Sequence, residues 1–476
     1  MNKNKKRWIG VFSFVLLIGL LLACGQPKET PTPPPTNTPP PTSTPVPTAT
    51  PVPTNTPEPT ATPEPEPTAT PEPEPTATKE STGPETPGDM EKGLVILSHT
   101  GFVDDSDTPH IVGEVYNNDE ANMEYIVIKA SLYDADGNFL VEEETYAYVD
   151  ILRPGEKSPF ELTLWDPPEG LDTYKLSVTG DKTSDEPIVG LEFVQYYDNM
   201  EDDGDWTMIG EVANNGDQVA SYVQIIVTLY NEAGEVVDVG FTTAERSLMR
   251  PDSISPFEIY VGDVHGDPTR YEIVVYGEEA MDYQLEDAAK MEMVNISYYF
   301  DVFDDLVIVG EVKNADESNA EFMKVFASFY NADDKLVGVG WSYAWADVLL
   351  PDENSPFKIS LFSTPEDVDH WTVWVQGSKT DDEPEGDLTL ENTDNTFSDD
   401  YVATFTGTVK NNGTETMKYI EVAVTIYDEE KNVVMVDWEY LDGEIEPGGT
   451  MDFEFEVQAS DKASSFKLNV QGTVAD

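Results

Sequence analysis

Hydrophobic and polar residues alternate along several segments of this chain. Aliphatic residues hold every second position in the two clearest examples: Ile420, Val422, Val424 and Ile426, and Val223, Ile225, Val227 and Leu229. A period of two places successive side chains on opposite faces of a strand, so each segment predicts a strand with one buried face and one wetter face. Only residues 278–290 carry a trace of a helical period. The pattern therefore predicts an all-β fold.

The strands belong to a repeat with five landmarks. A triplet, Gly-Glu-Val in three cases and Gly-Thr-Val in the last, begins at Gly113, Gly210, Gly310 and Gly407. A tyrosine follows twenty residues later, at Tyr133, Tyr230, Tyr330 and Tyr427. A proline, a phenylalanine and a glycine then recur: Pro154, Pro251, Pro351 and Pro447; Phe160, Phe257, Phe357 and Phe453; Gly180, Gly277, Gly377 and Gly472. Spacings of 97, 100 and 97 residues between the first glycines identify a tandem array.

Each copy is long enough for a small domain. About 95 residues with some seven short strands predict an immunoglobulin-like β-sandwich, so the chain should hold four of them in tandem. Asp134–Gly137 and Asn231–Gly234 look like hairpin turns between strands. The predicted boundaries are 91–185, 186–282, 283–385 and 386–476. The repeated tyrosine is expected to serve the fold, with its ring packed beside the turn.

The residues around that tyrosine resemble the FxLYD domain family. The four versions are Ala-Ser-Leu-Tyr-Asp from Ala130, Val-Thr-Leu-Tyr-Asn from Val227, Ala-Ser-Phe-Tyr-Asn from Ala327 and Val-Thr-Ile-Tyr-Asp from Val424. The family's Gly-Glu-Val…Asn-Asn and Pro-Gly…Pro-Phe segments match too, although no copy has the phenylalanine that opens the family's name. The resemblance covers residues 91–476. It implies small β-sandwiches of secreted or surface proteins, and no catalytic residues.

The N-terminus has a different pattern. A basic start is followed by an apolar run from Trp8 to Ala23 and then by Cys24, the only cysteine. This is the layout of a secretory signal. An uncleaved membrane helix is the alternative, but spanning the bilayer takes about 20 apolar residues. Leu-Leu-Ala-Cys-Gly also resembles the lipobox of bacterial lipoproteins, which implies cleavage after residue 23 and fatty acylation (palmitate) of Cys24.

Residues 24–90 should connect the lipidated cysteine to the first domain. From Pro27 to Gly88 the chain is almost entirely proline, threonine, glutamate and alanine. Proline blocks helix and sheet, and few apolar side chains are available to offset the entropy of ordering. The segment is expected to be a disordered, proline-rich linker. The resemblance and this linker together predict membrane attachment through the lipid, in the cell envelope, with the domains on the extracellular side.

Charge excludes some classes of partner. The chain has 26 lysines and arginines against 93 aspartates and glutamates, for a formal charge of −67. Such a surface repels nucleic acid, so no nucleic-acid partner is expected. At 39% hydrophobic residues the chain is nevertheless rich enough in apolar side chains to fold.

No recognisable catalytic motif is present. The four histidines lie at unrelated places, and neither a Gly-x-Ser-x-Gly nor a His-Glu-x-x-His sequence occurs. The expected function is presentation of the domains for binding, adhesion or spacing, with an unknown extracellular protein or glycan as partner and no catalysis.

Two clusters suggest alternatives. Aspartates precede the Gly-Glu-Val strand in the first two copies: Asp104, Asp105 and Asp107, and Asp202, Asp203 and Asp205. They could supply oxygen ligands for calcium, or they could simply be solvated turns. Trp341, Tyr343 and Trp345 form an alternating aromatic stripe. The stripe would suit a carbohydrate- or solute-binding lipoprotein, and its other interpretation is packing in the core or between domains.

Overall fold

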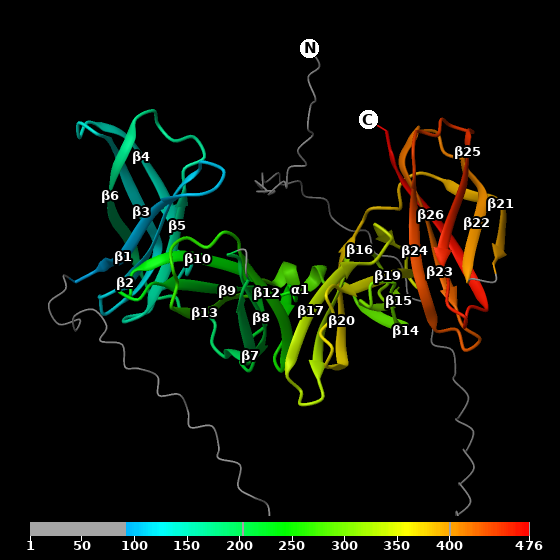
Figure 1. Ribbon diagram of the computed structural model, residues 1–476, viewed down its shortest axis with the longest axis horizontal. Helices are drawn as coiled ribbons and strands as arrows, with labels where there is room; N and C mark the ends of the chain where they lie inside the picture. Colours follow the sequence, from blue (N-terminus) through cyan, green and yellow to red (C-terminus); the bar gives the residue numbers. More distant parts are fainter. Residues whose placement is uncertain (1–91, 202–203, 399–400, 476) are drawn as a thin grey trace, which may run out of the picture. The chain divides into compact units, whose positions relative to one another are not determined.

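The strands of the chain form four β-sandwiches (Figure 1). The computed structural model describes residues 92–201, 204–398 and 401–475. Each sandwich pairs one three-stranded antiparallel sheet with a second sheet of three or four strands. The predicted all-β, tandem-sandwich fold class is confirmed.

Sandwich 1 extends from residue 94 to residue 183. Its first sheet has the order β1-β2-β5, formed by β1 (Leu94–Val103), β2 (Pro109–Asn117) and β5 (Lys157–Thr163). Its second sheet has the order β4-β3-β6, formed by β3 (Asn122–Asp134), β4 (Phe139–Tyr146) and β6 (Leu171–Thr183).

Sandwich 2, residues 191–279, repeats this plan. The first sheet is β7 (Leu191–Met200), β8 (Trp206–Asn214) and β12 (Ser253–Val261). The second sheet centres on β9 (Ala220–Tyr230), which pairs with β10 (Val236–Thr243), β11 (Leu248–Met249) and β13 (Arg270–Glu279).

Sandwich 3, residues 291–380, and sandwich 4, residues 388–474, follow the same order. In sandwich 3 the first sheet is formed by β14 (Met291–Phe300), β15 (Leu306–Asn314) and β19 (Asn354–Leu361). The second sheet centres on β16 (Asn319–Asn331), which pairs with β17 (Leu336–Tyr343), β18 (Val348–Leu349) and β20 (Val368–Thr380). In sandwich 4 the first sheet is formed by β21 (Leu388–Phe397), β22 (Val402–Asn411) and β25 (Thr450–Gln458). The second sheet centres on β23 (Met417–Tyr427), which pairs with β24 (Val433–Leu441) and β26 (Ser465–Val474).

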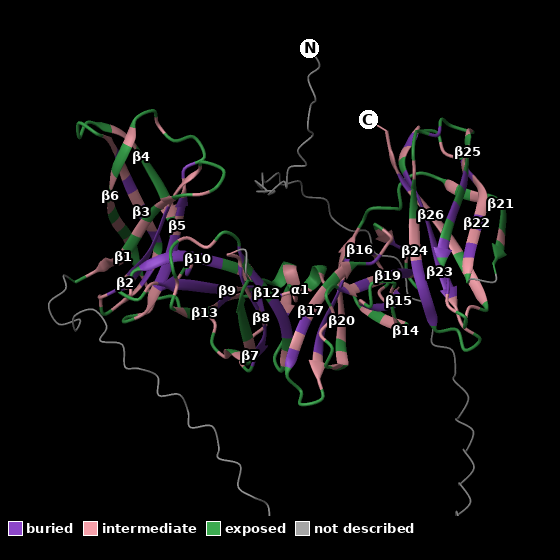
Figure 2. Cartoon of the chain, viewed as in Figure 1, coloured by how far each residue is buried: buried purple, intermediate pink, exposed green. Residues whose placement is uncertain are grey.

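The predicted aliphatic rows form the cores. All eight residues of the two rows on β9 and β23 are at most 2% exposed, and Figure 2 shows buried residues along these strands. The expectation of a wetter opposite face is wrong for these strands, because Ile226 and Tyr230 on β9 and Ala423 on β23 are buried or nearly so. The preceding sandwich covers that face, as described below.

The landmark glycine and phenylalanine are cross-strand partners. The pairs are Gly113 with Phe160, Gly210 with Phe257, Gly310 with Phe357 and Gly407 with Phe453. A Cβ added at Gly210 would lie 2.3 Å from Cζ of Phe257. The ring therefore occupies the space that any other residue's side chain would take, which explains why the two landmarks recur together.

A buried asparagine ends the strand that carries the landmark glycine in every sandwich. Asn214 is fully buried, and its amide donates hydrogen bonds to the carbonyl oxygens of Gln218 (2.8 Å) and Met249 (2.7 Å). Equivalent pairs of bonds are made by Asn117, Asn314 and Asn411. Each asparagine thus connects the end of a first-sheet strand to the turn that follows it and to the second sheet. In sandwiches 1, 2 and 4 a second asparagine follows directly, just beyond the strand: Asn118, Asn215 and Asn412.

One helix is present in the described residues. Helix α1 (Asp282–Asp287) lies in the connection between sandwiches 2 and 3, inside the segment whose sequence showed a trace of helical period. The repeat spacing there is 100 residues rather than 97, so this connection is the longest of the three.

Candidate functional site

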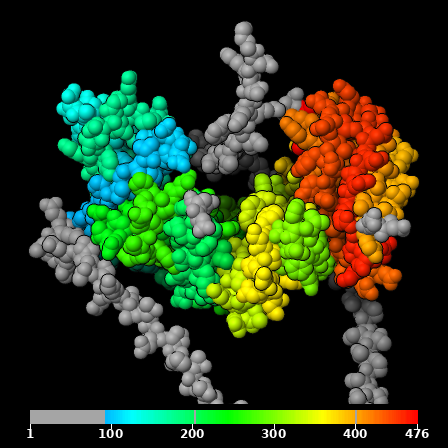
Figure 3. All heavy atoms as spheres, viewed as in Figure 1, coloured from blue at the N-terminus to red at the C-terminus, as the bar shows by residue number. Residues whose placement is uncertain are grey.

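Each sandwich docks on the one before it through equivalent strands. Strand β10 packs against β1 and β2, β17 against β7 and β8, and β24 against β14 and β15. Figure 3 shows the surfaces of the first two sandwiches, blue to cyan and green, in contact. Ile226 and Tyr276 of sandwich 2 belong to the buried cluster of sandwich 1. We call these three contacts the first, second and third joints.

The landmark glutamate and tyrosine meet at every joint. The glutamates Glu114, Glu211 and Glu311 are only 2–3% exposed. The tyrosine hydroxyl of the next sandwich donates to the glutamate carboxyl in each case: Tyr230 to Glu114, Tyr330 to Glu211 and Tyr427 to Glu311, the last two at 2.5 and 2.9 Å. The tyrosine was expected to serve the fold with its ring beside the turn, and its hydroxyl also bonds to the neighbouring sandwich, which that expectation did not include.

Burial sets the acidity of these tyrosines. Desolvation, followed by the hydrogen bond from its hydroxyl to Glu211, raises the pKa of Tyr330 to about 12. Desolvation and then the charge of the glutamate raise the pKa of Tyr230 and Tyr427 as well. All three hydroxyls therefore keep their proton at neutral pH and act as donors.

Two further contacts recur at the joints. The first residue of the docking strand bonds to the first strand of the preceding sandwich: the Val236 amide donates to Ser98 Oγ (2.8 Å) and the Leu336 amide to Gln195 Oε1 (3.0 Å). Before the landmark glycine of the last strand, Gln376 and Gln471 each donate from Nε2 to a carbonyl oxygen of the preceding sandwich at 2.9 Å. Each of these two contacts is present at two joints, formed by residues at equivalent positions of the repeat.

The two outer sandwiches carry different residues at the positions that form the joints elsewhere. Sandwich 1 has Lys129 where sandwich 2 has the buried Ile226, and Lys129 Nζ pairs with Glu142 (3.2 Å) and Glu144 (3.4 Å) of the same sheet. Sandwich 4 has Thr408 in place of the joint glutamate, and its hydroxyl donates to Asp452 Oδ1 (2.8 Å). Both positions carry polar groups satisfied within their own sandwich.

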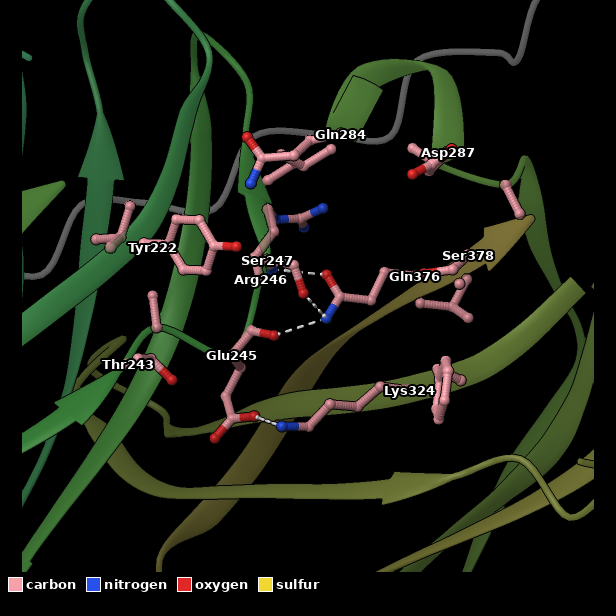
Figure 4. A pocket seen from close by; sticks show the side chains of 18 of the residues that line it. Tyr222, Thr243, Glu245, Arg246, Ser247, Gln284, Asp287, Lys324, Gln376 and Ser378 are labelled. Carbon is pink, nitrogen blue, oxygen red and sulfur yellow. Dashed lines mark hydrogen bonds and ion pairs between the residues drawn. The ribbon is translucent and has the colours of Figure 1, made fainter. Parts of the chain in front are cut away.

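A hollow of about 570 Å³ opens at the second joint (Figure 4). Its walls come from sandwich 2, from sandwich 3 and from helix α1, which contributes Tyr283, Gln284 and Asp287. Because α1 lies in the longest connection, this wall is particular to the second joint. Burial and then the neighbouring Tyr222 raise the pKa of Tyr283.

Polar contacts across the joint form one side of the hollow. Gln376 receives a hydrogen bond from the Ser247 amide (2.8 Å) and donates to the Glu245 carbonyl (2.9 Å). The Glu245 carboxylate forms an ion pair with Lys324 (Figure 4). The hollow is therefore framed by groups already bonded to one another, with aromatic and arginine side chains on its remaining walls.

The predicted aspartate clusters lie in turns. Asp104 Oδ1 accepts the amides of Ser106 (2.9 Å) and Thr108 (2.8 Å), and these bonds, led by that from Thr108, lower its pKa. Asp105 and Asp107 belong to the same turn. Asp205 accepts the Tyr260 hydroxyl and the Asp263 amide. Asp202 and Asp203 lie outside the described residues, within which no group of three or more His, Cys, Asp or Glu is placed to hold a metal.

The predicted aromatic stripe is divided. Trp341 and Tyr343 lie on β17 with their rings 5.8 Å apart and about half exposed, so neither is core. Trp345 lies beyond the end of the strand, where its carbonyl accepts Gln471 of sandwich 4. Tyr343 lines the hollow at the second joint, whereas Lys324 covers the Trp341 ring at 4.3 Å.

Cys24 and the predicted signal and linker lie outside the described residues. Within the residues that are described, no helix has the length and apolar character needed to cross a membrane.

Comparisons with known proteins give no family. No protein-family model matches the chain, and no curated protein matches it. The structure is similar to Escherichia coli alpha-2-macroglobulin activated by porcine elastase, with 11% identity over 77% of this chain and 42% of that chain, and a TM-score of 0.13. The native conformation of that protein gives 10% identity over 80% and 27% of the two chains, with a TM-score of 0.11. The chain spans less than half the length of both structures, and similarities this weak carry no argument.

Proposed function

We propose that this chain is a lipid-anchored surface protein that presents four β-sandwiches to an extracellular protein or glycan, without catalysis. The observation that carries the proposal is the recurrence of one joint three times. Buried glutamate and tyrosine side chains hold each sandwich against its neighbour, so binding surfaces on different sandwiches keep a fixed relation. Such an array is suited to binding, adhesion or spacing.

The anchor rests on the sequence. The lipobox-like residues 21–25 and the proline-rich residues after them supply an attachment point and a tether. We further propose that the sandwiches are FxLYD-like, on the residues around the four landmark tyrosines. A calcium-dependent surface protein is the weaker alternative, since Asp104 and Asp205 are already bonded to groups in their own sandwiches.

The test of the anchor uses Cys24→Ser in cells that are fed labelled fatty acid. The wild-type protein should carry label, sediment with membranes and be cleaved by protease added outside intact cells. The variant should carry no label and leave the membrane fraction. Thr408→Ala, which changes a residue far from the signal, is the control and should behave as wild type. Equal labelling of wild type and Cys24→Ser would refute the anchor.

A further inference from the structure

Each sandwich exposes an aromatic ring from a strained backbone position at the same place in its second sheet. Tyr125, Tyr222, Phe322 and Tyr419 have φ of 49°, 48°, 50° and 50° and are 67%, 55%, 67% and 70% exposed. They lie where the register shifts in β3, β9, β16 and β23. A left-handed backbone costs a bulky residue roughly 1–2 kcal/mol, and an exposed ring recovers little of this by burial. Folding does not explain an aromatic side chain here, so a role in binding is the better explanation.

Two of these rings meet at the second joint. Tyr222 of sandwich 2 and Phe322 of sandwich 3 both line the hollow, together with Tyr283 and Tyr343. Flat aromatic faces with a polar edge suit ligands that are apolar on one face and hydroxylated at the rim, and pyranose rings have this character. The volume of the hollow falls in the usual range for small-molecule sites.

Arginine is concentrated in the same hollow. The chain has five arginines, and four of them lie in the described residues. Arg153 and Arg270 pair with carboxylates. Arg246 and Arg250 both line the hollow, and neither forms an ion pair with any described carboxylate. In a chain with 93 acidic residues, two arginines without an acidic partner at one site leave positive charge that suits an anionic ligand.

The two arginines have different surroundings. The Arg246 guanidinium lies over the rings of Phe326 (5.4 Å) and Trp374 (5.9 Å), and its Nε donates to the Ile254 carbonyl (3.3 Å). These contacts hold Arg246 in the wall of the joint. Arg250 is exposed and keeps its planar fork of donors for a ligand carboxylate, which it can bind in bidentate fashion.

We propose that the hollow at the second joint binds a carboxylate-bearing saccharide, with sugar rings on Tyr222, Phe322 and Tyr343 and the carboxylate on Arg250. Of the two acidic side chains in the wall, Glu245 is neutralised by Lys324. The other, Asp287, lies on α1. The proposal deepens the proposed function by naming a ligand class, and it rests on that function only for its setting outside the cell.

The test is calorimetric titration of the full chain in detergent with trigalacturonate, against the methyl-esterified trisaccharide as a neutral match. We expect the ester to bind at least tenfold more weakly. Arg250→Ala should weaken trigalacturonate binding at least tenfold and Phe322→Ala at least fivefold. Tyr419→Ala removes an equally strained and exposed ring that does not line the hollow, and it should leave affinity within twofold of wild type.

Three outcomes would overturn the proposal: no binding of trigalacturonate at millimolar concentration, equal binding of the ester, or equal losses in Tyr419→Ala and Phe322→Ala. Arg250→Gln provides a second charge-removing variant, and near-ultraviolet circular dichroism would confirm that every variant is folded. Failure here leaves the anchor and the joints untouched, because those are tested by fatty-acid labelling and by exchange at the joints.

Discussion

Single hydroxyl and carboxyl groups connect each sandwich to the next. At the second joint the Glu211 carboxyl accepts from Ser328 (2.8 Å), Tyr330 and Gln195 (3.1 Å). Removing one partner of a buried hydrogen bond leaves the others unsatisfied, which costs about 1–3 kcal/mol. The same loss at an exposed position costs little, because water replaces the partner.

The first prediction concerns Glu211→Ala. The variant should open the second joint roughly 5- to 150-fold more often, which corresponds to the loss of about 1–3 kcal/mol. Hydrogen exchange at the Leu336 amide reports this opening, since that amide donates to Gln195 across the joint. Thr408→Ala changes the equivalent position of sandwich 4, and it should leave Leu336 exchange unchanged. Unaltered exchange in Glu211→Ala would show that the glutamate does not hold the joint.

The second prediction concerns Asp238, whose pKa burial raises to about 6. The folded chain therefore binds this proton more tightly than the unfolded chain, so sandwich 2 loses stability as pH rises from about 4 to about 6. The full cost is about 3 kcal/mol, at ~1.4 kcal/mol per pKa unit. Asp238→Asn should remove that pH dependence, as measured by exchange of the β9 amides at pH 4.5 and 7.5.

An opposite control is available in the same sandwich. The Tyr260 hydroxyl, and then the Asp263 amide, lower the pKa of Asp205, so its stabilising contribution is lost as pH falls below about 4. Asp205→Asn should therefore leave the change between pH 4.5 and 7.5 as in wild type. A pH dependence that persists in Asp238→Asn would assign it to other carboxyls, such as Glu258, whose pKa is raised by desolvation.

At the scale of elements, the sequence predicted what lies within a sandwich. The period-two rows, the turns and the spacing of landmarks all depend on residues that are close in sequence or on the same sheet. The role of the tyrosine could not be predicted this way, because its glutamate lies 116 to 119 residues earlier and in another sandwich. The hollow was missed for the same reason, although the three extra residues before sandwich 3 marked that connection as different.

The third prediction concerns the glycine and phenylalanine that face each other across β8 and β12. Gly210→Ala places a methyl group 2.3 Å from the buried ring of Phe257, so the ring or the strand must move. We expect a loss of about 1–3 kcal/mol in sandwich 2, measured by exchange of the β8 amides. Adding Phe257→Leu should restore part of the loss by vacating the space. If the β8 amides of Gly210→Ala exchanged hydrogen at the wild-type rate, the predicted clash would be contradicted.

At the scale of the whole molecule, charge opposes compactness. A formal charge of −67 makes the sandwiches repel one another and themselves. The joints hold against this repulsion through short-range contacts. Salt should therefore stabilise the array by screening.

The fourth prediction separates screening from calcium binding. Sodium, magnesium and calcium chlorides at matched ionic strength should raise the melting temperature of the array equally, because Asp104 and Asp205 already accept hydrogen bonds in their turns. A specific calcium site would make calcium raise the melting temperature further than sodium or magnesium does. Replacing Asp203 and Asp205 by Asn would then abolish the gain in sandwich 2.

The direction of the joint has a consequence for how such a chain can lengthen. Sandwiches 2 and 3 each present a tyrosine to the sandwich before and a glutamate to the sandwich after. A gene duplication that copied either of them in place would insert a module whose two faces already fit its new neighbours. Copies of the first or last sandwich would not fit, because Lys129 and Thr408 stand at the faces that must match. The length of the array could thus change by whole modules without any new interface having to evolve.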